Sequence, residues 1–319
     1  MTSLTIDQLA QFGPERCDAL SVDEARALCR RLATGRYENF SVLSAVVPPA
    51  LRDDFAAVYA FCRWADDLGD ETGDAARALE LLDWWRRELT SCFDGSPRHP
   101  VFVALAPTVR KHDLPFDLFE RLIRAFEQDQ SLRRYDTWDQ LIDYCRKSAD
   151  PVGRLVLMVL GEPRTADRFE ASDAICTALQ LTNHWQDIRR DVIERDRIYL
   201  PRDMIRIDDF DRRLADTARE GHAPDREFFG AARELVRSCV ARTWPLYERG
   251  ESLLQLVGPG ARPVVWLLAA GGQQVLRQIE LWNYETALHR PRLGRMRRAS
   301  LVWRAWRMAR TARRGGART

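Results

Sequence analysis

Hydrophobic residues recur every three or four positions along most of the chain, which is the spacing of amphipathic helices. Runs that alternate polar with β-branched residues, as strands do, are nearly absent. The pattern therefore predicts an all-α fold. Helices are expected at about residues 21–32, 49–69, 75–92, 98–111, 116–130, 136–147, 151–160, 167–193, 225–257 and 263–287.

No internal repeat, low-complexity stretch or linker interrupts these helices, so we interpret residues 1–288 as one helical domain. Residues 289–319 contain 11 arginines and no acidic residue, and they form an Arg-rich, amphipathic C-terminal extension. The whole chain carries 49 basic and 47 acidic residues, so the domain that precedes the extension is net acidic.

Composition excludes several classes of protein. With 45% apolar residues, the 319-residue chain is not wholly disordered. Its seven cysteines form no C-x-x-C pair, which argues against a disulfide framework and a zinc ribbon. The N-terminus lacks the segments of a signal peptide, and the longest apolar run, 264–270, is far shorter than the roughly 20 residues that span a bilayer. A reducing, cytoplasmic location is expected.

The basic extension mixes arginine with Trp, Leu, Val and Met at near-helical spacing over 295–310. This pattern favours an interfacial anchor that contacts anionic lipid peripherally, at the inner face of the membrane. A solvated basic tail and a tail folded onto the acidic domain are the alternatives. A non-catalytic helical protein that binds nucleic acid is a further alternative, but the acidic domain argues against nucleic acid as a partner.

A first group of chemically active residues lies near the end of the expected helix 49–69. Tyr59, Arg63, Asp66 and Asp70 share a stripe about 60° wide at about 100° per residue. Carboxylates one turn apart repel each other unless a cation lies near them. The stripe is consistent with a metal site, and also with a solvated helix end at which Arg63 neutralises its neighbours.

A second stripe, on the expected helix 167–193, contains Gln180, Asn183, Asp187 and Asp191. An amide oxygen beside two carboxylates is a hard ligand set that suits Mg²⁺. A salt-bridged surface face, formed with the adjacent arginines, is the alternative. Two such stripes on two long helices favour metal binding.

Together the stripes predict Mg²⁺-assisted chemistry on a diphosphate. A diphosphate becomes a good leaving group when metal and arginine neutralise the charge that develops as its carbon–oxygen bond breaks. Neither a Walker A sequence nor G-x-G-x-x-G occurs, so an ordinary nucleotide-binding loop is unsupported. The predicted metal ligands are Asp66, Asp70, Asn183, Asp187 and Asp191.

These motifs resemble those of the squalene/phytoene synthase family, the head-to-head isoprenoid synthases, over roughly residues 25–290. Asp66 and Asp70 are similar to the family's D-x-x-x-D, and Asn183, Asp187 and Asp191 to its N-x-x-x-D-x-x-x-D. Stretches 59–63 and 196–201 add to the match. Stretches 37–42, 134–138 and 144–154 most resemble the bacterial hopanoid-pathway hydroxysqualene synthase branch.

The resemblance implies an isoprenoid synthase-type helical bundle with a central apolar pocket, across which the two acidic motifs face each other. The five metal ligands and Tyr59 would be catalytic. The candidate aromatic walls for a carbocation are Phe40, Tyr59, Tyr144 and Trp185, with core packing as the alternative for each. His184 is expected to be packed or paired. The substrate-binding positions implied by the family are Arg36, Tyr37, Glu38, Asn39, Phe40, Arg63, Gln180, Gln186 and, as a C-terminal clamp, Arg290.

Four positions depart from the family or branch. Gln186 stands where many relatives carry arginine, which removes one cation from the diphosphate site and favours a substrate with a single diphosphate. Gln273, Ser41 and Asp150 replace a common Tyr, Pro and Asn, and they leave the exact substrate open.

The implied reaction is ionisation of presqualene diphosphate, rearrangement of the cyclopropylcarbinyl cation and capture by water to give hydroxysqualene and diphosphate. It needs Mg²⁺ and no nicotinamide cofactor. The alternative is a presqualene diphosphate, squalene or phytoene-type synthase that condenses two prenyl diphosphates, and a terpene cyclase is more distant. Chain length and quenching by water or by hydride stay open.

Overall fold

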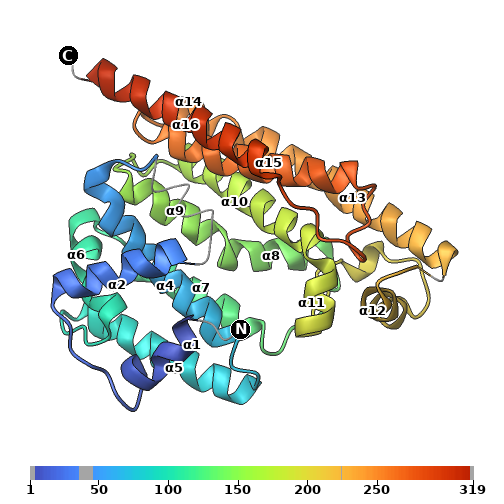
Figure 1. Cartoon of the computed structure of the whole chain (residues 1–319), viewed down its shortest axis with the longest axis horizontal. Coiled ribbons are helices and arrows are strands. Elements are labelled where there is room, and N and C mark those ends of the chain that lie inside the picture. The colour runs from blue at the N-terminus through green and yellow to red at the C-terminus, as the bar shows by residue number, and fades with distance from the viewer. Residues whose placement is uncertain (1–3, 36–45, 224, 317–319) are drawn as a thin grey trace.

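The computed structural model describes residues 4–35, 46–223 and 225–316 (Figure 1). These ranges contain helices and two isolated β-bridges but no strand, so the all-α prediction is confirmed. The N-terminal part comprises α1 (Leu4–Phe12), α2 (Val22–Gly35), the 3₁₀ turn η1 (Pro49–Leu51), α4 (Arg52–Asp70), α5 (Ala75–Phe93), α6 (Pro100–His112), α7 (Phe116–Gln128), α8 (Trp138–Ser148) and α9 (Asp150–Val159).

The C-terminal part contains the longest helices. Its elements are α10 (Ala166–Gln186), α11 (Ile188–Arg195), the 3₁₀ turn η2 (Arg202–Met204), α12 (Phe210–Glu220), α13 (Arg226–Gly250), α14 (Leu253–Leu256), α15 (Arg262–Leu281) and α16 (Arg295–Gly316).

The helix predicted over 225–257 is divided into α13 and α14, and α1 and α12 were not predicted. Two further boundaries were wrong near the segment that follows α15. The helix predicted over 167–193 is divided at Asp187, where the amide of Arg189 donates to the carbonyl of Thr286 at 3.3 Å. The helix predicted to reach residue 287 ends at Leu281, because the chain turns through left-handed conformations at Asn283 and Tyr284. Both differences come from the segment after α15, which turns back across the end of α10.

Helix α10 lies at the centre of the C-terminal part and packs against α9, α13 and α15, while α4 packs against α2, α5, α6 and α7 (Figure 1). Small residues allow the close approach of the central helices. A Cβ on Gly272 of α15 would lie 2.2 Å from the Tyr247 hydroxyl and 2.3 Å from Leu179. This close packing positions the end of α10 that carries the second acidic motif.

The residues after 288 pack back onto the bundle. Ala305 and Ala309 of α16 are buried in the same apolar cluster as side chains of α2, α4 and α6, and α16 lies along α15 (Figure 1). The described part of the extension is therefore folded onto the domain. The division into a domain and an extension stays a prediction.

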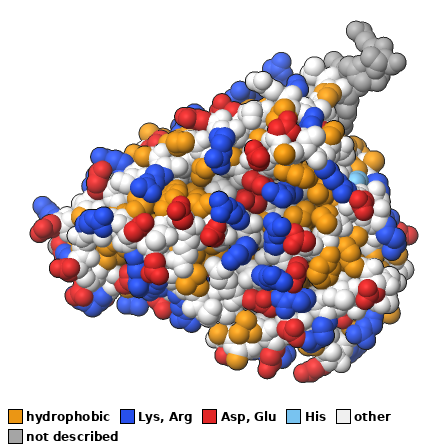
Figure 2. Space-filling view, turned by 180° about the vertical axis from the view of Figure 1, so that it is seen from behind, with side chains coloured by type: hydrophobic (Ala, Val, Ile, Leu, Met, Phe, Trp, Pro, Cys, Tyr) orange, Lys and Arg blue, Asp and Glu red, His pale blue; other side chains and the backbone are white. Residues whose placement is uncertain are grey.

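The charged surface and the free thiols agree with what the composition of the chain predicts. Figure 2 shows acidic and basic side chains interspersed with apolar patches over one face. All seven cysteines are free. None of the described helices is both long and apolar enough to cross a bilayer.

The apolar core of the N-terminal part is organised around a buried histidine. The His99 ring lies 4.5 Å from Trp64 and 4.8 Å from Trp85 between ring centroids, and His99 is fully buried. Its Nδ1 accepts the Val101 amide at 3.2 Å and so caps α6. Burial lowers the pKa of His99 to about 3, so the ring is neutral.

We expect the free energy of unfolding of the wild type, relative to that of a His99→Asn variant, to fall as the pH is lowered from 7 to 5. The folded pKa is depressed and an unfolded histidine titrates near pH ~6.5, so the unfolded state takes up the proton first. Unfolding is then favoured by about 1.4 kcal/mol for each pH unit below ~6.5. Asparagine does not titrate and is itself a good helix cap. Urea unfolding at several pH values measures the difference, and a constant difference would contradict the assignment.

Candidate active site

The first acidic motif occupies the last turn of α4. Arg63 lies one turn earlier and contacts both Asp66, at 3.3 Å, and Asp67, to which its Nε donates at 3.0 Å. Asp67 is buried, whereas the Asp66 side chain stays 39% exposed. Tyr59 lies one turn before Arg63 and is partly buried. Arg63 thus neutralises its acidic neighbours, and the Asp66 carboxylate remains accessible.

The second motif spans the junction between α10 and α11. Asp187 stands at the junction and Asp191 in the first turn of α11, and both are buried. The amide of Asp187 donates to the Asn183 carbonyl, and that of Asp191 to the Asp187 carbonyl, both at 2.9 Å. The helical spacing therefore continues through the junction. Arg190 lies 3.2 Å from Asp187 and 3.5 Å from Asp191.

Two arginines join the motifs. Arg195 lies 2.8 Å from Asp70 and 3.4 Å from Asp191, so it bridges the end of α4 and α11. Arg197 donates to Asp70 at 2.8 Å, across 127 positions of sequence. The tertiary structure thus brings the two motifs together.

A further carboxylate lies beneath this bridge. Asp129, which follows α7, is buried, lies 3.7 Å from Arg197 and accepts the Tyr144 hydroxyl at 2.7 Å. Burial raises the pKa of Asp129 to about 7, although Arg197 and Tyr144 oppose the shift. His184 stacks on Tyr199 at 3.7 Å, and burial followed by the charge of Arg197 lowers the pKa of His184 to about 3. His184 is therefore packed and neutral, as expected.

The cluster is rich in mutually repelling carboxylates. Burial and then Asp70 raise the pKa of Asp66 to about 7, with Arg63 opposing. Burial also raises the pKa of Asp191 to about 6, with Asp187 and Asp70 adding to the shift. The carboxylates of the cluster outnumber its arginines by one. The carboxylates belong to Asp66, Asp67, Asp70, Asp129, Asp187 and Asp191, and the arginines are Arg63, Arg190, Arg195, Arg197 and Arg290.

The segment after α15 closes one side of the cluster. Arg290 contacts Asp187 through both Nε and Nη2, the latter at 2.9 Å, and its role as a clamp on the substrate stays a prediction. Gln186 donates to the carbonyl of Pro291 at 2.5 Å. Gln186 therefore holds the C-terminal segment, and Arg290 supplies a cation in this part of the cluster.

The other predicted residues have different outcomes. Arg36, Tyr37, Glu38, Asn39 and Phe40 lie outside the described residues. Gln180 is partly buried on α10, and Asn183 is exposed near its end. Trp185 is buried and donates to Thr243 at 2.9 Å, which is core packing.

Sequence reasoning missed Arg195, Arg197 and Asp129 as members of the cluster. Arg197 lies in the stretch 196–201 that supported the family resemblance, so a signal for it was present. Asp129 has no comparable local signal, because its partners are Tyr144 and Arg197 from other elements.

Carboxylate and amide oxygens are the ligands that a hard divalent cation prefers, but arginines occupy many of the carboxylate oxygens of the cluster. Within the described ranges, no three His, Cys, Asp or Glu side chains converge so as to hold one metal ion. Neighbouring carboxylates contribute to the raised pKa of Asp66 and of Asp191. Added positive charge reduces this repulsion between carboxylates. Magnesium binding, the catalytic roles and the central apolar pocket stay predictions.

Comparisons with known proteins identify relatives of this chain. The family model for squalene/phytoene synthase matches residues 33–299. A hydroxysqualene synthase from Rhodopseudomonas palustris is 41% identical over 173 residues, 54% of this chain and 58% of that protein. A phytoene synthase from Arthrospira platensis is 32% identical over 269 residues, 81% of this chain and 84% of that protein. The match thus spans just over half of the hydroxysqualene synthase.

Solved structures show the same fold. A squalene synthase from Alicyclobacillus acidocaldarius superposes with a TM-score of 0.71 at 41% identity, over 82% of this chain and 95% of that one. A dehydrosqualene synthase bound to a ligand superposes with a TM-score of 0.75 at 23% identity, over 91% of this chain and 98% of that one.

We expect Arg197→Gln to lower the free energy of unfolding by about 3–5 kcal/mol, because it leaves buried Asp70 and Asp129 without their shared cation. Adding Asp129→Asn should return about 1–3 kcal/mol of this loss, since it removes one of the two carboxylates. Denaturant unfolding measures both values.

The matched control is Arg202→Gln, which breaks the contacts of an exposed arginine with Asp136 at 3.9 Å and Asp211 at 3.7 Å and should cost under about 0.5 kcal/mol. Equal losses of unfolding free energy for Arg197→Gln and Arg202→Gln would contradict this prediction, because the buried ion pairs would then contribute no more to stability than the exposed ones.

Proposed function

Because the chain belongs to the squalene/phytoene synthase family, we propose that it ionises a prenyl diphosphate, and that its reaction converts presqualene diphosphate and water into hydroxysqualene and diphosphate. The observation that carries this choice is the identity to hydroxysqualene synthases, which exceeds the identity to phytoene synthases. Gln186 supports this choice. Many relatives have a further arginine at its position, whereas Gln186 is neutral and holds the C-terminal segment, which favours a substrate with a single diphosphate.

The arginines of the cluster bind and orient the diphosphate. Arg63, Arg190 and Arg290 are partly accessible, while Arg195 and Arg197 hold Asp70 in position. An arginine within hydrogen-bond distance of the leaving oxygens stabilises the charge that forms as the carbon–oxygen bond breaks.

Arginine alone does not balance a diphosphate here, because the cluster already has more carboxylates than arginines. We therefore propose Mg²⁺ held by Asp66, Asp70, Asn183, Asp187 and Asp191, which offer the oxygen ligands that this ion prefers. When bound, Mg²⁺ supplies Lewis-acid neutralisation of the leaving diphosphate. The proposed hydration is redox-neutral, so we propose that it uses no nicotinamide cofactor.

The second candidate is condensation of two prenyl diphosphates by a presqualene diphosphate, squalene or phytoene-type synthase. It is favoured by the match to phytoene synthase, which covers 84% of that protein. Both candidates use the same acidic cluster, so the product distinguishes them.

We also propose peripheral contact with an anionic membrane at the inner face of the cytoplasmic membrane, through α16. The helix contains arginines and no acidic residue, and Trp303 and Trp306 are 54% and 41% exposed. Nucleic acid is not a proposed partner.

We expect Asp66→Asn and Asp187→Asn each to lower turnover by at least about a hundredfold, because each removes a negative oxygen ligand while preserving side-chain volume. Asp216→Asn on α12, an exposed carboxylate that also pairs with arginine, is the control and should leave turnover unchanged. Chelation of divalent cations should abolish activity, and added Mg²⁺ should restore it. Activity that survives both the substitutions and chelation would contradict the metal assignment.

Product analysis decides the reaction. The purified protein with Mg²⁺ is given presqualene diphosphate or farnesyl diphosphate, each with and without a nicotinamide reductant. We expect hydroxysqualene from presqualene diphosphate alone, because water is the proposed nucleophile. Turnover of farnesyl diphosphate to presqualene diphosphate or squalene would instead establish the condensing alternative.

A further inference from the structure

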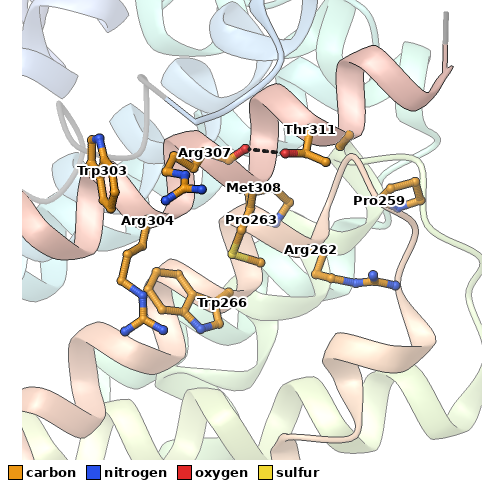
Figure 3. Close-up of a pocket in the computed structure, with 10 residues that line it drawn as sticks. Pro259, Arg262, Pro263, Trp266, Trp303, Arg304, Arg307, Met308 and Thr311 are labelled. Carbon is orange, nitrogen blue, oxygen red and sulfur yellow. Dashed lines mark hydrogen bonds between the residues drawn. The ribbon is translucent and has the colours of Figure 1, made fainter.

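A groove separates the start of α15 from the second half of α16, far from the acidic cluster (Figure 3). Its volume is about 620 Å³, within the range of ligand sites in proteins. The floor is apolar, with Pro263 and Trp266 from α15 and Met308 from α16. Three arginines line the groove: Arg262, Arg304 and Arg307.

Two of these arginines contact aromatic rings. The Arg304 guanidinium lies 4.9 Å from the Trp266 ring centroid, and that of Arg307 lies 4.8 Å from Trp303 (Figure 3). In the part of the chain that the structure describes, no carboxylate lies within ion-pair distance of Arg262, Arg304 or Arg307. Their charge is therefore uncompensated, and planar guanidinium groups suit the oxygens of a phosphate.

The combination of an apolar floor and a basic lining fits an amphiphile better than a simple anion. The neighbouring Trp303 is 54% exposed, and exposed tryptophan beside arginine is typical of membrane interfaces. A nucleic acid would need free aromatic faces for base stacking, but Arg304 and Arg307 already lie over the rings of Trp266 and Trp303.

We propose that this groove binds an anionic phospholipid of a membrane surface, with the phosphate on Arg262, Arg304 and Arg307 and the start of an acyl chain against Trp266 and Met308. The inference deepens the proposed peripheral contact of α16, on which it rests, and it is independent of the proposed reaction. Helix α15 separates the two sites: its 20 residues span about 30 Å, with the groove at its start and the acidic cluster beyond its end.

The test uses the full-length protein and vesicles of phosphatidylcholine with or without 30% phosphatidylglycerol, about the composition of a moderately anionic membrane. The groove variant is R304Q/R307Q. The matched control is R295Q/R297Q, which removes the same charge from exposed positions on the same helix outside the groove. Flotation measures the partition of each protein.

We expect the wild type to bind phosphatidylglycerol vesicles and R304Q/R307Q to lose at least about tenfold more affinity than R295Q/R297Q, because the two pairs differ in the groove and not in net charge. A short-chain phosphatidylglycerol below its micelle concentration should bind the wild type and the control variant but not the groove variant. Inorganic phosphate at the same concentration should not compete.

Equal losses for the two variants, equal binding to pure phosphatidylcholine, or full competition by inorganic phosphate would each overturn the lipid site. Competition by duplex DNA that also depends on Arg304 and Arg307 would overturn it in favour of nucleic acid. Without vesicles, R304Q/R307Q should turn over presqualene diphosphate at the same rate as the wild type. That readout separates failure of the groove from failure of the proposed reaction.

Discussion

Neutralisation of buried carboxylates by arginine is the interaction on which the arrangement of this protein depends. Asp70, Asp129, Asp187 and Asp191 have side chains less than a tenth exposed, and a buried carboxylate without a cationic partner is costly. Arg195 joins Asp70 to Asp191, so the end of α4 and α11 are held together. The same surplus of carboxylates that requires the arginines makes the cluster receptive to added positive charge, which is the basis for proposing a divalent cation and a diphosphate.

The acidic cluster also determines the path of the C-terminal segment. Arg290 and the backbone of Thr286 and Pro291 contact residues 186–189, so the chain crosses the junction of α10 and α11 before it enters α16. This crossing leads α16 back along α15, where Ala305 and Ala309 enter the core. The position of the basic helix is thus a consequence of the same electrostatic requirement that builds the site.

Gln186 shows how the C-terminal segment completes the cluster. Its side-chain amide donates to the Pro291 carbonyl, and Arg290, at the neighbouring position of that segment, reaches Asp187. The local positive charge is therefore supplied by the crossing segment. The chain is similar in sequence to relatives named for hydroxysqualene and for phytoene synthesis, and a shared fold does not by itself decide which reaction a chain performs.

The sequence by itself determined the all-α class and the helical spacing of Asp66 and Asp70. Each depends on residues within one turn of each other, where local geometry decides. Only the tertiary structure decided the break at Asp187, the burial of Asp129 and the bridge through Arg195 and Arg197. These features depend on ion pairs and hydrogen bonds between residues as far as 127 positions apart, and such contacts exist only after the helices have packed.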